Sequence, residues 1–207
     1  MPDAALHNIL PGSPEAALLA ALGKRSLVLV GMMGAGKSSV GRKLGQRLAL
    51  PFVDADVAIE EAAGMSIPDI FETRGEAEFR AGEARVIARL LEGGAQVLAT
   101  GGGAYMNGDT RDVVRRRGLA IWLRADFDVL MRRIKRRSDR PLLRTADPAA
   151  TLRELMDKRY PVYALADLTI ESRDVPHDVI VDEIVDGLHA MLCGASAAAQ
   201  PVAEKLP

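Results

Sequence analysis

The stretch Gly31-Met-Met-Gly-Ala-Gly-Lys-Ser38 has the residue types and spacing of a phosphate-binding loop, G-x-x-x-x-G-K-[ST]. Glycines let backbone N–H groups turn inward around phosphate oxygens, and a helix starting here points its unpaired N–H groups at the same anion. Lys37 is placed to reach the β- and γ-phosphates, and the Ser38 hydroxyl to ligate magnesium. The alternative is a glycine-rich turn without a ligand. The residues expected to contact a nucleotide here are Gly34, Ala35, Gly36, Lys37, Ser38 and Ser39.

Two carboxylates, Asp54 and Asp56, follow the short apolar segment PFV. In an extended chain, residues i and i+2 point the same way, so both side chains are expected to face one site. One would act on magnesium through water, and the other would accept a hydrogen bond from a substrate hydroxyl. The alternative is that one of the two aspartates caps the N-terminus of a helix.

On a helix, Glu76, Arg80 and Glu83 share one face. Such a stripe is often a solvated set of ion pairs that contributes little to stability. The functional interpretation is that Glu83 orients Arg80, so that the guanidinium binds a substrate carboxylate through two parallel hydrogen bonds.

Three successive glycines, Gly101 to Gly103, follow the apolar segment QVLAT. Open α/β sheets bind ligands at the carboxyl ends of their strands, and glycines there let a bound molecule approach the backbone closely. A flexible turn is the alternative, although three consecutive glycines exceed what a turn requires.

Seven basic residues and one acid, Asp139, lie between Arg132 and Arg144. A solvated helix end or an RNA-binding patch would have this composition. The net charge of -1 and the 4% aromatic content argue against nucleic acid. We therefore expect a basic flap that closes over a triphosphate, excludes water and neutralises charge during phosphoryl transfer.

The elements that must position these residues alternate along the chain. Apolar runs of strand length are separated by segments of helical spacing, which predicts a parallel sheet covered on both faces in an α/β fold. The predicted strands are 26–30, 52–56, 96–100, 119–123 and 168–170. The predicted helices are 37–49, 56–64, 67–75, 76–94, 109–118, 126–137, 148–166 with an interruption at Pro161, and 175–192.

Length and composition fit a single domain of 207 residues with 48% apolar content. Cys193 is the one cysteine of the sequence, which favours a reducing compartment and a cytoplasmic enzyme. No apolar run has the length of a membrane span. We expect the segments 1–24 and 193–207 to be poorly ordered, with one short helix in the first, since both are rich in small residues and match none of the motifs.

Taken together and in order, the motifs of residues 25–192 resemble the shikimate kinase family. They are GMMGAGKS, DAD, EFRAGE, TGGGA, RPLL and KRYPVY. The resemblance implies a three-layer P-loop fold like that of nucleoside monophosphate kinases, with a five-stranded parallel sheet flanked by helices. It also implies a substrate-binding region near 54–82 and a mobile lid near 133–147.

For the acceptor, the resemblance implies phosphorylation of shikimate by ATP to give shikimate 3-phosphate. Asp56 would hydrogen-bond the ring hydroxyls and accept the proton of the attacking hydroxyl. Arg80 and Arg159 would clamp the carboxylate, and Gly102 and Gly103 would contact the substrate through their backbone.

For the nucleotide, the resemblance implies that Arg140 in the lid binds the phosphates and stabilises the transition state. Arg133 would lie against adenine, with Arg136 as its rival for that role. Mg²⁺ would be the cofactor, held by Ser38 and, through water, by Asp54.

Three alternatives remain at this point. A related small-molecule kinase, such as a gluconate kinase, would share the loop and the basic lid. A nucleotide-dependent switch would need a guanine-reading N-K-x-D motif, which the sequence lacks. An RNA-binding module would rest on the basic run. The favoured prediction is a monomer that takes ATP and shikimate and contacts neither nucleic acid nor membrane.

Overall fold

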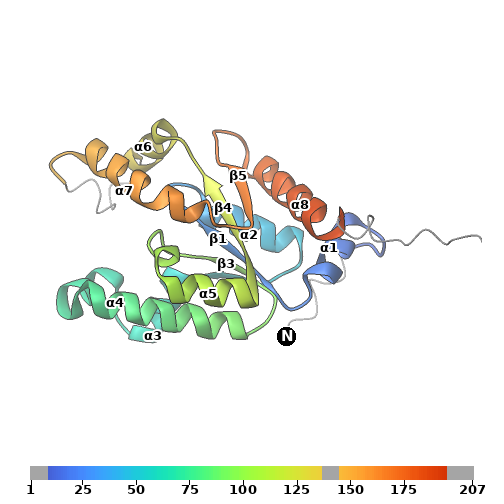
Figure 1. The fold of residues 1–207 in the computed structure, drawn as a ribbon, viewed down its shortest axis with the longest axis horizontal. Helices are drawn as coiled ribbons and strands as arrows, with labels where there is room; N and C mark the ends of the chain where they lie inside the picture. The colour runs from blue at the N-terminus through green and yellow to red at the C-terminus, as the bar shows by residue number, and fades with distance from the viewer. Residues whose placement is uncertain (1–8, 137–144, 195–207) are drawn as a thin grey trace, which may run out of the picture.

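The structure is a computed structural model that describes residues 9–136 and 145–194. Its centre is a five-stranded parallel sheet in the order β2-β3-β1-β4-β5 (Figure 1). The five predicted strands are therefore confirmed, and the carboxyl ends of β1 and β3 lie side by side. The strands are β1 (Ser26–Val30), β2 (Phe52–Asp54), β3 (Val97–Ala99), β4 (Gly118–Arg124) and β5 (Leu168–Glu171).

Helices cover both faces of the sheet (Figure 1). On one side α1, α2 and α8 pack together, and on the other α5 packs on β4 and against α4. No helix in the described ranges is long and apolar enough to cross a bilayer. The helices are α1 (Pro14–Leu22), α2 (Lys37–Arg47), α3 (Ala55–Ala63), α4 (Ile67–Glu92), the 3-10 turn η2 (Ala104–Met106), α5 (Gly108–Arg117), α6 (Phe127–Lys135), α7 (Pro148–Tyr163) and α8 (His177–Cys193).

The two helices expected over 67–94 meet at Gly75, whose backbone is not helical, at φ 79° and ψ 170°. The predicted break at this glycine is therefore confirmed, and α4 consists of two helical segments joined by a kink. One helix boundary differs from the prediction. The interruption expected at Pro161 is wrong, because α7 continues through this residue to Tyr163. A proline in the last turn of a helix removes one backbone hydrogen bond, and here the tyrosines on either side are held by packing on Trp122.

The short helix expected within residues 1–24 is present as α1, and it is anchored to the main core. Ser13 caps α1, whose Leu18 and Leu22 are buried in the main core, and α1 packs on α8. Glu15 forms an ion pair with Arg47 of α2. The sequence of α1 is almost entirely alanine and leucine, so it carries no polar stripe to mark a helix packed on a core.

Replacing Leu18 by alanine should therefore destabilise the fold. Leu18 is 0% exposed, and a buried Leu→Ala change costs about 2 to 5 kcal/mol through lost burial and the cavity left behind. Urea denaturation followed by circular dichroism measures this loss. The matched control is Leu10→Ala, since Leu10 is 76% exposed. Equal unfolding midpoints for the two variants would contradict the packing of α1 on the core.

Candidate active site

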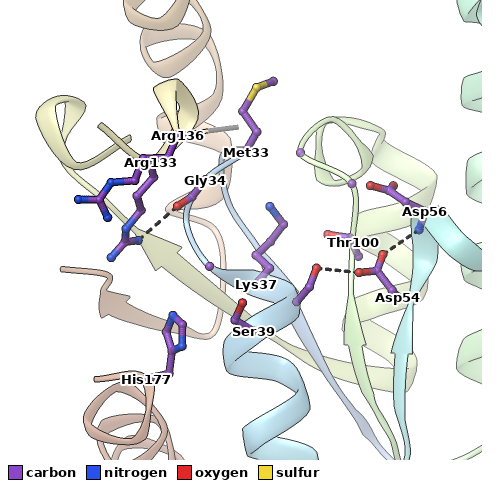
Figure 2. A pocket seen from close by; sticks show the side chains of 14 residues that line it. Met33, Gly34, Lys37, Ser39, Asp54, Asp56, Thr100, Arg133, Arg136 and His177 are labelled. Carbon is purple, nitrogen blue, oxygen red and sulfur yellow. Dashed lines mark hydrogen bonds between the residues drawn. The ribbon is translucent and has the colours of Figure 1, made fainter. Parts of the chain in front are cut away.

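A cavity of about 440 Å³ opens at the carboxyl ends of β1 and β3 (Figure 2). It collects residues that are far apart in the sequence, from the phosphate-binding loop, the β2–α3 junction, the glycine segment after β3, and α6 and α8. Its lining comprises Met33, Gly34, Gly36, Lys37, Ser38, Ser39, Asp54, Asp56, Thr100, Gly101, Gly102, Arg133, Arg136 and His177.

The loop after β1 has the backbone of an anion cradle. Gly31, Gly34 and Gly36 have φ values of 136°, 84° and 93°, a region that residues with side chains rarely adopt. Gly36 is the N-cap of α2 and supplies no side-chain hydrogen bond, so the first N–H groups of the helix are left for an anion. Lys37 Nζ donates to the carbonyl oxygens of Gly31 at 2.8 Å and Met32 at 3.0 Å. The Lys37 side chain thus folds back over the loop in which it is predicted to bind phosphate.

Asp54 joins β2 to this loop and to α3. Its Oδ2 accepts a hydrogen bond from the Ser38 hydroxyl at 2.7 Å, and its Oδ1 accepts from the backbone N–H of Asp56 at 3.2 Å (Figure 2). Asp54 is therefore both a helix N-cap and a partner of the loop serine. The extended geometry expected for the pair is wrong, because Asp56 lies in the first turn of α3. Asp56 nevertheless lines the cavity.

The three glycines after β3, here called the glycine strip (Gly101 to Gly103), lie directly against charged side chains. A β-carbon on Gly101 would lie 2.8 Å from Asp56 Oδ1 and 2.9 Å from Glu83 Oε1. On Gly103 it would lie 2.6 Å from Arg80 Nη1. Contacts below 3.0 Å mean that a β-carbon at Gly101 or Gly103 would force these charged side chains to shift.

Arg80 and Glu83 form the predicted pair within α4. Arg80 Nη1 lies 2.7 Å from Glu83 Oε2, and a longer contact of 3.3 Å joins Arg80 to the exposed Glu76. Glu83 is only 2% exposed, and burial raises the pKa of its carboxyl, although the Arg80 guanidinium opposes this shift. Among the described residues, Glu83 Oε1 has no hydrogen-bond partner. This oxygen therefore offers a buried acceptor at the edge of the glycine strip.

Arg159 and Tyr163, both on α7, meet at the carbonyl of Gly102. Arg159 Nη1 donates to this oxygen at 3.2 Å, and the Tyr163 hydroxyl donates to it as well. The hydroxyl also lies 3.9 Å from Met32 Sδ, beside the phosphate-binding loop. Tyr163 is fully buried, and burial raises its pKa to about 12. It therefore stays a neutral donor at physiological pH and ties α7 to the glycine strip.

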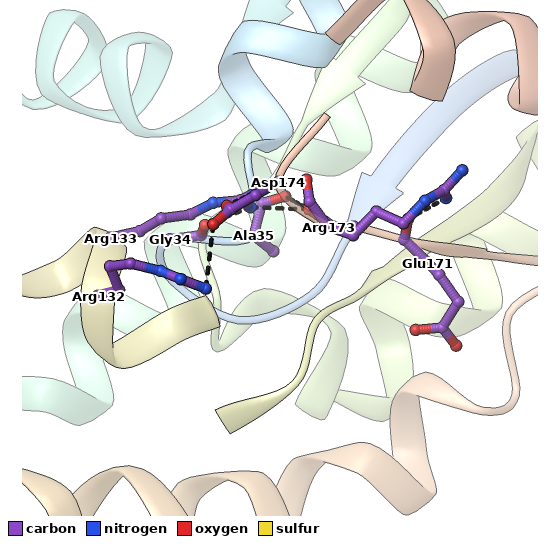
Figure 3. A network of polar contacts seen from close by, with 8 residues as sticks. Gly34, Ala35, Arg132, Arg133, Glu171, Arg173 and Asp174 are labelled. Atoms are coloured by element: carbon purple, nitrogen blue, oxygen red, sulfur yellow. Dashed lines mark hydrogen bonds and ion pairs between the residues drawn. The ribbon is translucent and has the colours of Figure 1, made fainter. Parts of the chain in front are cut away.

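Arg133, on α6, lies across the phosphate-binding loop from Asp54 and forms several hydrogen bonds (Figure 2). Its Nη1 donates to Gly34 O at 3.2 Å and to Ser172 Oγ at 2.8 Å, while its Nη2 donates to Arg173 O at 2.7 Å. Asp174 forms ion pairs with Arg133 and with the adjacent arginine of α6 (Figure 3). The guanidinium is thereby fixed beside the cavity, which Arg133 helps to line. Arg136 also lines the cavity.

The structure thus brings together the predicted residues of the loop, Asp54, Asp56, Arg80, Gly102, Gly103, Arg133 and Arg159. Arg140, predicted as a catalytic residue in the lid, lies outside the described residues.

Sequence reasoning missed several residues of the site, among them Tyr163, Ser172 and His177. Tyr163 is the last residue of the motif KRYPVY, but the motif does not indicate that its hydroxyl donates to Gly102 O. Ser172 donates to Ala35 O at 2.7 Å and follows β5 directly, so the rule for strand ends could have found it. His177 lines the cavity from the first residue of α8, and no motif marks it.

A phosphate cradle at the end of a parallel strand, beside an acceptor site with carboxylates and guanidiniums, defines a P-loop phosphotransferase that acts on a small molecule. The family model described as "Shikimate kinase" matches residues 33–189. A shikimate kinase of Bradyrhizobium diazoefficiens is 62% identical over 201 residues, 97% of this chain and 96% of that protein. The chain therefore belongs to the shikimate kinase family.

The solved structures agree with this assignment. A shikimate kinase from Acinetobacter baumannii, solved in complex with shikimate, aligns with a TM-score of 0.76 at 35% identity, covering 88% of this chain and 99% of that chain. A gluconokinase from Sinorhizobium meliloti aligns with a TM-score of 0.58 at 18% identity, covering 86% and 98% of the two chains, which shows the fold alone. The family model, the relatives and the solved structures thus assign the chain to the same family of kinases.

Replacing Tyr163 by phenylalanine should lower kcat/KM for shikimate more than it lowers the free energy of unfolding. The change keeps the ring and removes one donor to Gly102, which costs about 1 kcal/mol of unfolding free energy. A small displacement of a positioning group lowers the rate, so we expect kcat/KM for shikimate to fall about tenfold. Steady-state kinetics and urea denaturation measure both effects.

The matched control is Tyr160→Phe, on the same helix as Tyr163. It removes a hydrogen bond from the Tyr160 hydroxyl to Ala125 O. It should lower stability without changing the kinetics for shikimate. If Tyr163→Phe retains full kcat/KM, the hydroxyl does not position the glycine strip.

Proposed function

We propose that the chain transfers the γ-phosphoryl group of ATP to the 3-hydroxyl of shikimate, with the acceptor lying on the glycine strip. The observation that carries this proposal is the convergence of Arg80, Arg159 and Asp56 on three successive glycines, beside the phosphate-binding loop. A β-carbon on Gly102 would lie 3.3 Å from Arg159 Nη1 and 3.6 Å from Gly31 O. The clamp and the loop are thus neighbours.

The acceptor site suits a small polyhydroxy acid. Arg80 and Arg159 approach the strip from α4 and α7 and can grip one carboxylate from two sides, since guanidiniums bind carboxylates through paired hydrogen bonds. Asp56 would accept a hydrogen bond from a ring hydroxyl and take its proton as the hydroxyl attacks. Gly102 and Gly103 leave the ring free to lie against the backbone.

The nucleotide site uses the other half of the cavity. Backbone N–H groups of Gly34 to Ser39 would surround the phosphates, and Lys37 would exchange its loop carbonyls for phosphate oxygens. Arg133 lies beside Gly34 and would flank the base, with Arg136 as the alternative. We assign Arg140 the neutralisation of charge on the transferred group.

The residues fit Mg²⁺. Ser38 Oγ and Asp54 Oδ2 meet at 2.7 Å next to the loop, which gives one hydroxyl and one carboxylate where the phosphates would lie. Magnesium keeps several waters and takes few protein oxygens in kinases. When bound, the ion neutralises phosphate charge. Ser38 would hold it directly and Asp54 through water.

Positioning and charge neutralisation then account for the reaction. The carboxylate clamp fixes the acid group, Asp56 aligns the hydroxyl with the terminal phosphate, and Lys37 offsets the charge that develops there. Closure of the predicted lid over 133–147 would exclude water and so prevent hydrolysis of ATP. We further propose that the enzyme acts as a cytoplasmic monomer, which agrees with its single cysteine.

Replacing Arg80 by lysine tests the clamp while keeping the charge. Lysine cannot form the two parallel bonds, so KM for shikimate should rise about tenfold or more. The dissociation constant for ATP should stay unchanged, because Arg80 bonds to Glu76 and Glu83 and to no residue of the loop. Coupled ADP-release kinetics and a nucleotide titration provide the two values. Unchanged kinetics for shikimate would refute the clamp.

The same assay with shikimate, quinate and gluconate as acceptors tests the substrate. We expect turnover with shikimate far above that with the other two acids. ADP release that is fastest with gluconate would favour the related sugar-acid kinase instead.

A further inference from the structure

A second cavity, of about 370 Å³, lies between α3 and α4 and shares no lining residue with the first. Its floor is apolar. Ile59, Ile70 and Phe79 form a small buried cluster separate from the main core, with Val86 packed against it. We call this cavity the α3–α4 groove. An apolar hollow of this size is large enough for one aromatic ring system.

The rim of the α3–α4 groove is strongly basic. Arg74, Arg85 and Arg89 line it together with one acid, Glu78. Glu78 reaches Arg85 only at 3.5 Å, and both side chains are more than half exposed. Arg85 and Arg89 are four residues apart on α4 and so lie on the same face of the helix. An apolar floor beneath three guanidiniums and one carboxylate is complementary to a molecule with an apolar body and a carboxylate.

Gly82, also in the lining, is not explained by the fold. A glycine in a helix interior costs about 1 kcal/mol relative to alanine. Gly82 is not among the glycines with positive φ, and a β-carbon there would meet only Arg85 Nη2, at 3.9 Å. Neither backbone strain nor packing in the described chain requires a glycine here. Its effect is to keep the groove open above Phe79.

Phe79 and Arg80, which are adjacent on α4, connect the groove to the proposed acceptor site. The ring of Phe79 forms part of the floor, and the guanidinium carbon of Arg80 lies 5.0 Å from the centre of the same ring. Arg80 in turn holds Glu83 at the glycine strip. A ligand that presses on Phe79 would therefore shift the group proposed to grip the substrate carboxylate.

We propose that the α3–α4 groove is a second binding site, for a small aromatic carboxylate, and that its occupancy changes the affinity for shikimate through Phe79 and Arg80. The ring of the ligand lies on the apolar floor, and its carboxylate is bound by Arg85 and Arg89. The coupling rests on the role of Arg80 in the proposed function, whereas binding itself does not.

Isothermal titration calorimetry with 2-naphthoate tests the binding, with shikimate and ADP saturating so that the clamp is filled. We expect saturable binding of one molecule, weakened about tenfold or more by Gly82→Leu and by the pair Arg85→Gln/Arg89→Gln. The pair Arg115→Gln/Arg116→Gln on α5, with the same charge change, should bind like the parent.

Three results would overturn the site: no saturable heat up to about 5 mM, binding that survives both groove variants, or binding lost equally in the α5 pair. Circular dichroism confirms folding of each variant, and the arginine pair decides alone if Gly82→Leu does not fold.

Kinetics separate the coupling from direct competition. Saturating 2-naphthoate should change KM for shikimate about threefold or more in the parent and leave it unchanged in Gly82→Leu. An equal rise in both proteins shows that the probe competes at the carboxylate clamp and contradicts the coupling. An unchanged KM in the parent contradicts it too, while the proposed function remains testable by the Arg80→Lys kinetics.

Discussion

The site depends on the close approach of charged side chains to the bare backbone of Gly101 to Gly103. Each glycine faces a different group: two carboxylates at Gly101, Arg159 at Gly102 and Arg80 at Gly103. These side chains come from α3, α4 and α7, so three helices meet at one short segment at the end of β3. A β-carbon on Gly101 or Gly103 would displace a charged side chain that is proposed to surround the acceptor.

Electrostatics explains why this crowding is stable. Asp56 and Glu83 place two carboxylates at Gly101, and the charge of Asp56 adds to burial in raising the pKa of Glu83. Arg80 and Arg159 offset this cost, and both lower the pKa of Glu83 against the effect of burial. The same guanidiniums then face the place where an anionic substrate would bind. One charge arrangement thus serves both the unliganded fold and the proposed recognition.

Local patterns predicted most of the fold and much of the site. The apolar runs gave the strands because parallel strands are buried on both faces, and the spacing of Arg80 and Glu83 predicted their pair because helical geometry is local. What could not be predicted depends on contacts between distant segments. The hydroxyl of Tyr163 meets Gly102 across 61 positions, and Arg133 meets Ser172 across 39. The order of α1 likewise comes from a neighbouring helix and not from its own pattern.

The most direct measurement is the affinity for shikimate of the Gly103→Ala variant. A methyl group there would lie within 2.7 Å of the Arg80 guanidinium, which is the end of a flexible side chain and can move aside. We expect an unchanged unfolding midpoint and nucleotide affinity but a loss of shikimate affinity of about a hundredfold, or close to 3 kcal/mol. In the control Gly108→Ala, the nearest atom to the new methyl is Arg111 Nη2 at 3.7 Å, and affinity should be retained. Full shikimate affinity in Gly103→Ala would contradict the claim that this strip holds the acceptor.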